Sequence, residues 1–241
     1  LSAPFSAPAL LGIQIYPQDP LKFSFLVGQG TASIPDTEMR AAVEKAVRYF
    51  LTGLAVPEDD LWVNLSPYEQ DRIIPDILSR TDAGLDMLEQ DYLLKQLAAS
   101  LTYPETEFGK AFWGRVYEKA KERFGTTDIP AQTFNKVWIV PEHSVVYETA
   151  DRAVIAESRL KVMLESDYLA WKENSPLEEI SPEQDISHDV MREIVVPLLE
   201  EEVNAGAHFA PLRQIYHALI LSSWFKDRLK MTAVAQVYGD R

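Results

Sequence analysis

The sequence predicts an α+β fold, in which strands and helices occupy separate parts of the chain. Apolar side chains recur at every second position in some segments and about every 3.6 residues in others, the periods of strands and helices. The expected order is two strands, three helices, a β-meander and two further helices, which lacks the regular strand–helix alternation of a parallel sheet. With 46% apolar residues in 241, the chain can bury a core of ordinary size.

The first predicted unit is an N-terminal β-hairpin. Residues 11–16 and 21–27 form its strands, and the Pro17-Gln18-Asp19-Pro20 segment forms the turn between them. The second strand alternates so that four apolar side chains share one face: Leu21, Phe23, Phe25 and Val27.

Three helices are expected next, over 36–54, 81–101 and 105–124. Asp36 is a suitable N-cap for the first helix, and Gly125 is a suitable C-terminal stop for the third. Together with two helices near the C-terminus, they give about five helices that pack as a bundle.

The second half of the chain begins with segments rich in β-branched residues, at 133–140, 144–148 and 152–164. They predict a small meander of two or three antiparallel strands, and a short helix follows over 167–172.

The chain is expected to form a single compact unit over residues 1–241. The Ser-Pro-containing segment 173–187 is the best linker candidate, and it allows a boundary before a C-terminal helical pair within 188–231. Pro197 should interrupt the first helix of this pair, because proline removes a backbone donor inside a helix.

Composition and charge exclude several functions. A net charge of −14 argues against binding to nucleic acid, which needs clustered Lys and Arg, and against docking on anionic lipid. The absence of cysteine excludes disulfides, thiolate metal sites and cysteine nucleophiles. No run of ~18 apolar residues predicts a membrane span. The chain begins Leu1-Ser2-Ala3-Pro4, which suggests a processed product or part of a longer protein.

Metal, cofactor and nucleophile signatures are missing. No HExxH pattern and no GxSxG elbow is present, so we predict no metal site, no cofactor and no assigned catalytic residue. Gly28-Gln29-Gly30 is too short for a phosphate fingerprint and favours a loop that needs positive φ. Each of the four histidines is more readily a solvated or structural residue than a ligand: His143, His188, His208 and His217.

Carboxylates at the start of the second helix offer one further candidate. Asp82, Asp86 and Glu89 would share a face, where they could hold a cation or act as an acid–base pair. Acids in a first turn equally complement the positive end of the helix dipole, and we favour that structural interpretation.

The stretch from Asp60 to Pro75 is the richest in residues suited to binding. It places large aromatics, an amide, acids and an arginine in an irregular segment, and such loops often carry binding sites. The alternative is that Trp62 fills the core while the charged residues pair and cap. The candidate binding residues are Trp62, Asn64, Tyr68, Glu69 and Arg72.

Four segments together resemble a family of uncharacterised hypothetical proteins from uncultured bacteria. They are Trp62 to Pro75, Asp91 to Pro104, Phe134 to Pro141, and Leu212-Arg213-Gln214-Ile215-Tyr216. The likeness extends over most of the chain from about Ile13. It implies a bacterial source and carries no activity with it.

Two classes of function follow. The first is a non-catalytic binding or assembly domain of a larger bacterial protein, whose partner is another protein or the remainder of a longer chain. The second is a carboxylate-based hydrolase that uses Glu69, Asp71 and Arg72. A peptide- or carbohydrate-binding module built on Trp62 is a third alternative.

Overall fold

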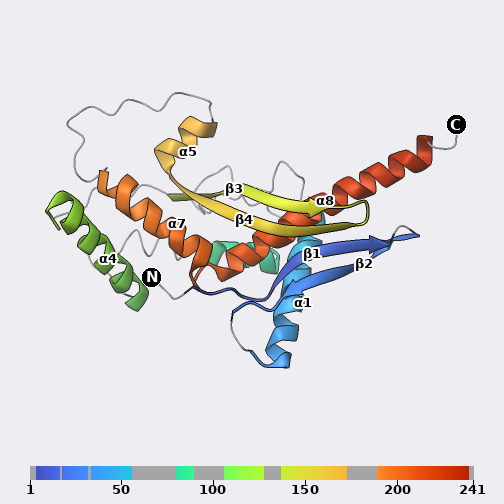
Figure 1. Cartoon of the computed structure of the whole chain (residues 1–241), viewed down its shortest axis with the longest axis horizontal. Coiled ribbons are helices and arrows are strands. Elements are labelled where there is room, and N and C mark those ends of the chain that lie inside the picture. Colours follow the sequence, from blue (N-terminus) through green and yellow to red (C-terminus); the bar gives the residue numbers. More distant parts are fainter. Residues whose placement is uncertain are drawn as a thin grey trace.

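The computed structural model describes residues 4–16, 18–31, 34–55, 80–89, 106–127, 137–172 and 189–238, and it confirms the α+β class (Figure 1). The strands are β1 (Ala9–Tyr16), β2 (Asp19–Gly28), β3 (Val137–Glu148) and β4 (Arg152–Leu164). The helices are α1 (Asp36–Ala55), α4 (Glu107–Phe124), α5 (Glu165–Lys172), α7 (Val196–Ala205) and α8 (Ala210–Tyr238). A short helix over 82–89 and a π-helical turn, η2 (Met191–Val195), complete the described elements.

The four strands form one antiparallel sheet in the order β2-β1-β4-β3. The predicted N-terminal hairpin is β1–β2, and the two hairpins are joined because residues 12–14 of β1 pair with residues 152–154 of β4. The segments expected at 133–140 and 144–148 contribute to a single edge strand, β3, whose register shifts after Pro141. An edge strand tolerates proline at such a bulge, since the missing N–H removes no ladder bond there.

The helix ends follow local capping chemistry. At the start of α4, the Thr106 hydroxyl accepts a hydrogen bond from the Gly109 N–H at 2.9 Å. At its end, Gly125 has a φ of 73° and its N–H bonds to the Lys121 carbonyl, as the sequence predicted. The helix over 82–89 confirms the start of the second predicted helix, whose remainder over 90–101 lies outside the described residues.

The interruption predicted at Pro197 is present in a specific form. Helical residues from 189 widen into η2 and then continue as α7, with Pro197 in the first turn of α7. The last helix, α8, ends at Tyr238, beyond the limit of the C-terminal helical pair predicted within 188–231. The linker predicted at 173–187 lies outside the described residues, so the domain boundary stays a prediction.

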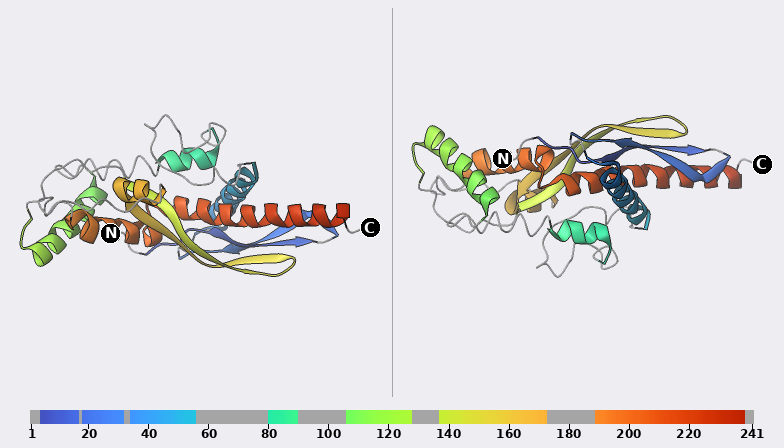
Figure 2. Two further views of the ribbon diagram at one scale, coloured as in Figure 1. Left: turned by 90° about the horizontal axis from the view of Figure 1, so that it is seen from above. Right: turned by 90° about the horizontal axis from the view of Figure 1, so that it is seen from below.

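The core lies between one face of the sheet and the helices. In both views of Figure 2, the long α8 runs along the sheet, with α1 on the same side. Four phenylalanines, from β2, α1 and α8, meet there with ring centroids 4.9–5.8 Å apart: Phe23, Phe25, Phe50 and Phe225. Gly53 of α1 lets this helix approach α8, because a Cβ atom there would lie 2.4 Å from Ser222 Oγ.

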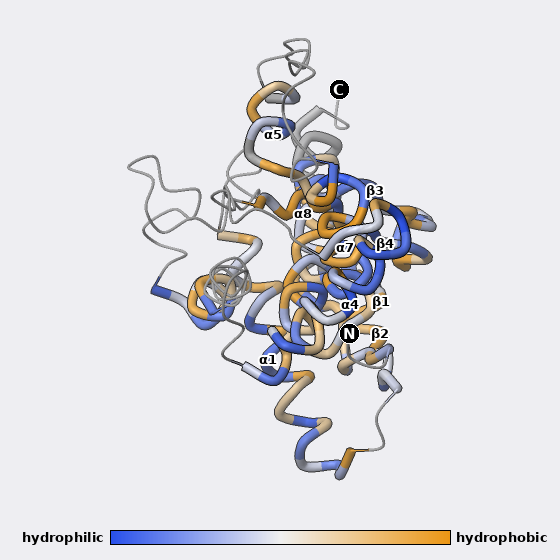
Figure 3. Tube along the Cα trace, turned by 90° about the vertical axis from the view of Figure 1, so that its left-hand side faces the viewer, coloured by the Kyte–Doolittle hydropathy of each residue, from blue (hydrophilic) through white to orange (hydrophobic). Residues whose placement is uncertain are grey.

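The other face of the sheet, which we call the outer face, is covered by no described helix along the two hairpins (Figure 2). Strands alternate their side chains between two faces. Four side chains are buried toward the helices: Ile13 and Ile15 of β1, and Ala153 and Ile155 of β4. The residues between them on each strand therefore point outward. Figure 3, viewed along the long axis, shows both hydrophobic and hydrophilic residues on β3 and β4.

Candidate functional site

The binding residues predicted from the sequence fall in a segment that the structure leaves out. All five candidate binding residues lie outside the described residues: Trp62, Asn64, Tyr68, Glu69 and Arg72. The same holds for Asp71. Their role therefore stays a prediction.

Two of the three carboxylates expected to share a face of the helix over 82–89 form ion pairs with α1. Asp86 lies 2.9 Å from Lys45 Nζ and also accepts a hydrogen bond from the Tyr49 hydroxyl. Asp82 lies 3.0 Å from Arg48 Nε. Burial and the bond to Asp86 raise the pKa of Tyr49, so its hydroxyl stays protonated. These contacts join two helices, which gives Asp82 and Asp86 a structural role; the helix-dipole interpretation stays a prediction.

Three of the four histidines lie in the described part of the chain, and each has a different neighbour. His143 Nε2 is 3.1 Å from Glu157, and the His208 ring stacks on Phe108 with centroids 3.9 Å apart. His217 Nε2 is 2.7 Å from the Ser158 hydroxyl. Within the described ranges, no group of three His, Asp or Glu side chains could hold a metal ion. His188 lies outside them.

The outer face carries a row of side chains that crosses all four strands. Leu26 of β2 stands opposite Gly12 of β1, Gly12 opposite Val154 of β4, and Val154 opposite Tyr147 of β3. Leu26 is 52% exposed and Tyr147 is 70% exposed, and both are large apolar or aromatic side chains. Val145, one outward position before Tyr147, is 39% exposed.

Gly12, in the middle of this row, has no side chain that projects from the sheet. A Cβ atom at this position would lie 2.7 Å from the Ala153 carbonyl oxygen and 3.2 Å from Val154, so only glycine fits between β2 and β4. The row is therefore a shallow strip, with an aliphatic side chain at one end and an aromatic one at the other.

Polar side chains lie beside the strip. Arg152 donates to the Gln14 side chain at 3.1 Å, and the Tyr16 and Ser24 hydroxyls are 2.9 Å apart. Lys22 lies over the Tyr16 ring, 5.2 Å from its centroid. An apolar centre beside polar and charged groups is the usual composition of a protein-binding surface.

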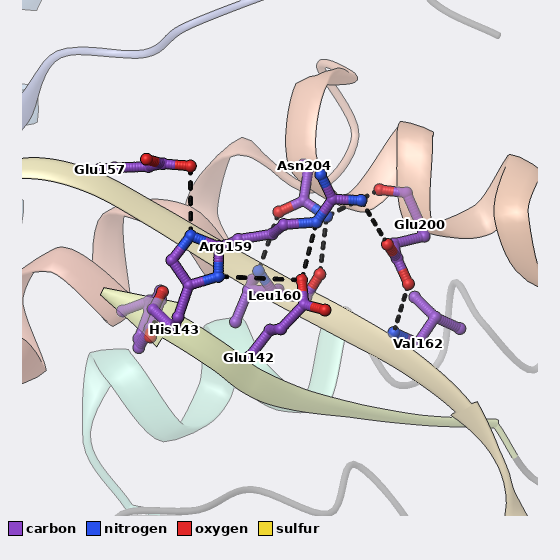
Figure 4. Close-up of polar contacts among 9 residues, drawn as sticks. Glu142, His143, Glu157, Arg159, Leu160, Val162, Glu200 and Asn204 are labelled. Carbon is purple, nitrogen blue, oxygen red and sulfur yellow. Dashed lines mark hydrogen bonds and ion pairs between the residues drawn. The ribbon is translucent and has the colours of Figure 1, made fainter. Parts of the chain in front are cut away.

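Farther along β4, a polar network fixes α7 against the strand (Figure 4). Arg159 lies 2.8 Å from Glu142 and 2.6 Å from Glu200, and these carboxylates, Glu200 first, hold the pKa of Arg159 above its usual value. Glu200 also accepts a hydrogen bond from the Val162 N–H at 3.3 Å. Because each of these carboxylates lies against arginine, the network is suited to positioning α7 and not to proton transfer.

A pocket of about 310 Å³ is lined by residues of β3 and α8. Its walls are mostly apolar, with three hydroxyl groups and one histidine: Pro141, His143, Ser144, Tyr216, Leu219, Ile220 and Ser223. The hydrogen-bonded Ser158 and His217 are not part of its lining. Burial lowers the pKa of His217 to about 4, which keeps this imidazole neutral beside the Ser158 hydroxyl.

The sequence pattern assigns the residues of the outer face to strands but does not indicate that they are exposed. The available signal is an apolar residue at a position that the alternation assigns to the other face of the strand, for example Leu26 between Phe25 and Val27. That signal becomes interpretable only when the register shows that Leu26, Val154 and Tyr147 lie in one row.

Comparison of the chain with protein families, with curated proteins and with solved structures found no match. The resemblance to uncharacterised bacterial proteins therefore stays a prediction. Within the described ranges, no helix combines the length and the apolar character needed to cross a bilayer.

Proposed function

We propose that this chain is a non-catalytic protein-binding domain that joins a larger assembly through the outer face of its sheet. The observation that carries the proposal is the row formed by Leu26, Gly12, Val154 and Tyr147, whose two large end members are more than half exposed. A sheet normally buries one face and solvates the other with polar side chains. Large exposed apolar side chains on the solvated face are typical of a surface that is covered by a partner.

The polar neighbours of the row support the same function. Tyrosine and arginine are favoured anchors in protein interfaces, and Tyr147 and Arg152 stand on this face. The rigid sheet also presents them at fixed spacing, which lowers the entropy lost on binding. The hydrolase and the carbohydrate-binding alternatives depend on residues 62–72 and remain predictions.

The test is site-specific photocrosslinking in the native host. A photoreactive residue replaces Leu26 in one variant and Tyr147 in another, and Leu51 provides the control, since it is 50% exposed on α1. We expect the first two positions to capture the same polypeptide and the Leu51 position not to capture it.

Affinity for the purified, captured polypeptide then decides the matter. Tyr147→Ser and Leu26→Ser should each weaken binding by about tenfold or more, as removal of an interface anchor does. Leu51→Ser should leave the affinity unchanged. Full affinity in both outer-face variants would contradict the proposal.

A further inference from the structure

The pocket formed by β3 and α8 has the size and composition of a small-molecule site, and the proposed function makes no use of it. Its volume is about 310 Å³, and an apolar cavity of about 150 Å³ is already large enough to bind benzene. Ligand pockets are mostly apolar, with a few polar groups that orient the ligand. The apolar walls of this pocket carry three hydroxyl groups, those of Ser144, Tyr216 and Ser223.

The register of β3 and β4 explains why space is left here. Ser144 of β3 is paired directly with Ser158 of β4, so the two side chains share a face of the sheet. The Ser158 hydroxyl reaches His217 of α8, which shows that this face is turned toward the helix. The pairs before and after them on this face are apolar: Pro141 with Leu160, and Val146 with Ile155. Two small serines in an otherwise apolar row leave a space that larger side chains would fill.

The pocket extends from the surface of β3 to the buried side of α8. Ser144 and His143 are exposed, whereas Tyr216 and Leu219 are each 5% exposed. The lining residues of α8 recur at intervals of three and four positions and so share one face of the helix: Tyr216, Leu219, Ile220 and Ser223. A molecule that enters beside β3 would therefore rest its apolar part on α8.

The hydroxyl groups indicate what kind of atom the ligand should present. Burial raises the pKa of Tyr216, with the bond to Ser144 acting in the opposite direction, so the phenol stays protonated and is a hydrogen-bond donor. It donates to the His143 carbonyl at 3.3 Å, which is longer than the usual range of about 2.5–3.0 Å between two oxygens. A ligand oxygen in the pocket therefore offers the Tyr216 hydroxyl a shorter hydrogen bond than this one.

The charge of the lining restricts the ligand further. None of the described residues that line the pocket is Asp, Glu, Lys or Arg, although these make up 25% of the chain. The His143 imidazole is engaged by Glu157 at 3.1 Å. A charged ligand would lose its hydration here without gaining a counter-charge, which is costly.

We propose that this pocket binds a small uncharged molecule with an aromatic or branched aliphatic body and one hydroxyl or carbonyl oxygen. The body would lie against Leu219 and Ile220, and the oxygen would accept a hydrogen bond from Tyr216. The site shares no residue with the row on the outer face, so it stands or falls independently of the proposed function.

The test uses four single-ring probes of matched shape with the full chain: p-cresol, toluene, p-toluate and p-methylbenzylammonium. Binding is followed by NMR of the isotope-labelled protein. We expect p-cresol to shift the backbone signals of Ser144, Leu219 and Ser223 in a saturable way. Toluene should bind about fivefold more weakly, since it lacks the oxygen and one hydrogen bond. The anion and the cation should each bind about tenfold more weakly or less, because the pocket offers no counter-charge.

Two variants identify the site. Ser223→Leu fills the pocket and should abolish p-cresol binding, whereas Ser24→Leu adds the same bulk to an exposed position of β2 and should leave it unchanged. Tyr216→Phe keeps the ring and removes the hydroxyl, so the affinity for p-cresol should fall about fivefold, to the level of toluene. The affinity for toluene should not change in this variant, which remains informative if Ser223→Leu does not fold.

Several results would overturn the inference. One is the lack of a saturable shift at the pocket residues with any probe, and another is p-cresol binding that survives in folded Ser223→Leu. Equal affinity for p-cresol and toluene would show that the oxygen is not recognised, and equal affinity for p-cresol and either ion would show that charge is not excluded. None of these results bears on photocrosslinking through Leu26 and Tyr147.

Discussion

The side-chain amide of Asn204 in α7 makes both backbone hydrogen bonds that a neighbouring strand would make with Leu160 in β4. Asn204 Nδ2 donates to the Leu160 carbonyl at 2.7 Å, and Asn204 Oδ1 accepts from the Leu160 N–H at 2.9 Å. Pairing of β1 with β4 covers only residues 152–154, so the edge of β4 at Leu160 is open to α7. The Asn204 amide thus satisfies the edge of β4 at Leu160, which could otherwise pair with another chain.

Replacing this amide should destabilise the fold strongly. Asn204→Ala removes the hydrogen-bond partners of the Leu160 N–H and of the Leu160 carbonyl. Each buried group left without a partner costs about 1–3 kcal/mol. We expect the free energy of unfolding to fall by about 2–3 kcal/mol in urea titrations. The control is Glu201→Ala on the same helix, whose exposed carboxylate lies 3.8 Å from Arg115, and it should change stability by less than about 0.5 kcal/mol. Equal effects of the two substitutions would refute the role assigned to Asn204.

Two glycines provide a matched pair with opposite expectations. A Cβ atom at Gly206 would lie 2.0 Å from Glu202 Oε1, and this carboxylate cannot move easily because Glu202 is 1% exposed and lies 3.2 Å from His208. Gly206→Ala should therefore lower the melting temperature, at a cost of about 1–3 kcal/mol.

Gly114, in the middle of α4, has open space on its side-chain side, since no atom lies within 4 Å of the position that a Cβ would take. Gly114→Ala should stabilise the protein by about 0.5–1 kcal/mol, because alanine is the better helix former. Thermal melts of both variants test the pair, and stabilisation by Gly206→Ala would show that Glu202 is not fixed in place.

We expect His217 to contribute to the loss of folding stability at acid pH. Burial lowers its pKa to about 4 in the folded state, with the backbone of Leu10 acting in the opposite direction, whereas the unfolded value is about 6.5. The unfolded state therefore binds more protons between these two values. The contribution to stability is complete above pH 6.5 and is lost as the pH falls toward 4; it amounts to about 3 kcal/mol.

The variant His217→Gln isolates this component, because glutamine can form a hydrogen bond with the Ser158 hydroxyl without titrating. Unfolding free energies measured from pH 7 to pH 4 should fall less steeply for this variant than for the unmodified chain. His143→Gln on the surface of β3 should retain the steep slope, since His217 is intact. An unchanged slope in His217→Gln would contradict the assignment.

Arg213 should not be replaceable by lysine. Its guanidinium donates to three backbone carbonyls, those of Val203, Phe5 and Gly206, at 2.7–2.8 Å. Burial lowers its pKa to about 10, and the nearby Glu202 carboxylate opposes that change. An ammonium group cannot reproduce the planar fork, so Arg213→Lys should cost about 2 kcal/mol or more.

Hydrogen exchange provides a local measurement for this change. The Phe5 N–H bonds to the Ala205 carbonyl at 2.8 Å, next to the carbonyl that Arg213 holds. Its exchange should accelerate in Arg213→Lys and not in the surface control Arg115→Lys. Full protection of Phe5 in Arg213→Lys would show that the segment is held by other contacts.

Much of the fold could be predicted because its signals are local. The boundaries of α4 follow from Thr106 and Gly125, and the interruption near Pro197 follows from the missing N–H of proline. The alternation of Leu21, Phe23, Phe25 and Val27 predicted the second strand of the hairpin. The positive φ of 77° at Gly30 likewise agrees with the loop predicted there.

The candidate site could not be predicted in the same way, because it depends on pairs of residues far apart in the chain. Val154 and Gly12 are neighbours only because β1 pairs with β4, and the sequence carries no local mark of that pairing. The binding residues predicted at 62–72 were chosen for their composition alone, and they lie outside the described residues.

By itself, the amino-acid sequence determined the α+β class, the positions of helices and hairpins, and a strongly acidic character, since periodicity, caps, turns and charge are properties of neighbouring residues. The tertiary structure decided which face of the sheet the helices cover, which carboxylates are neutralised, and which side chain closes the edge of β4. Burial and hydrogen bonding are satisfied between distant segments, so the exposure of Tyr147 and the position of Asn204 emerge only when those segments are packed together.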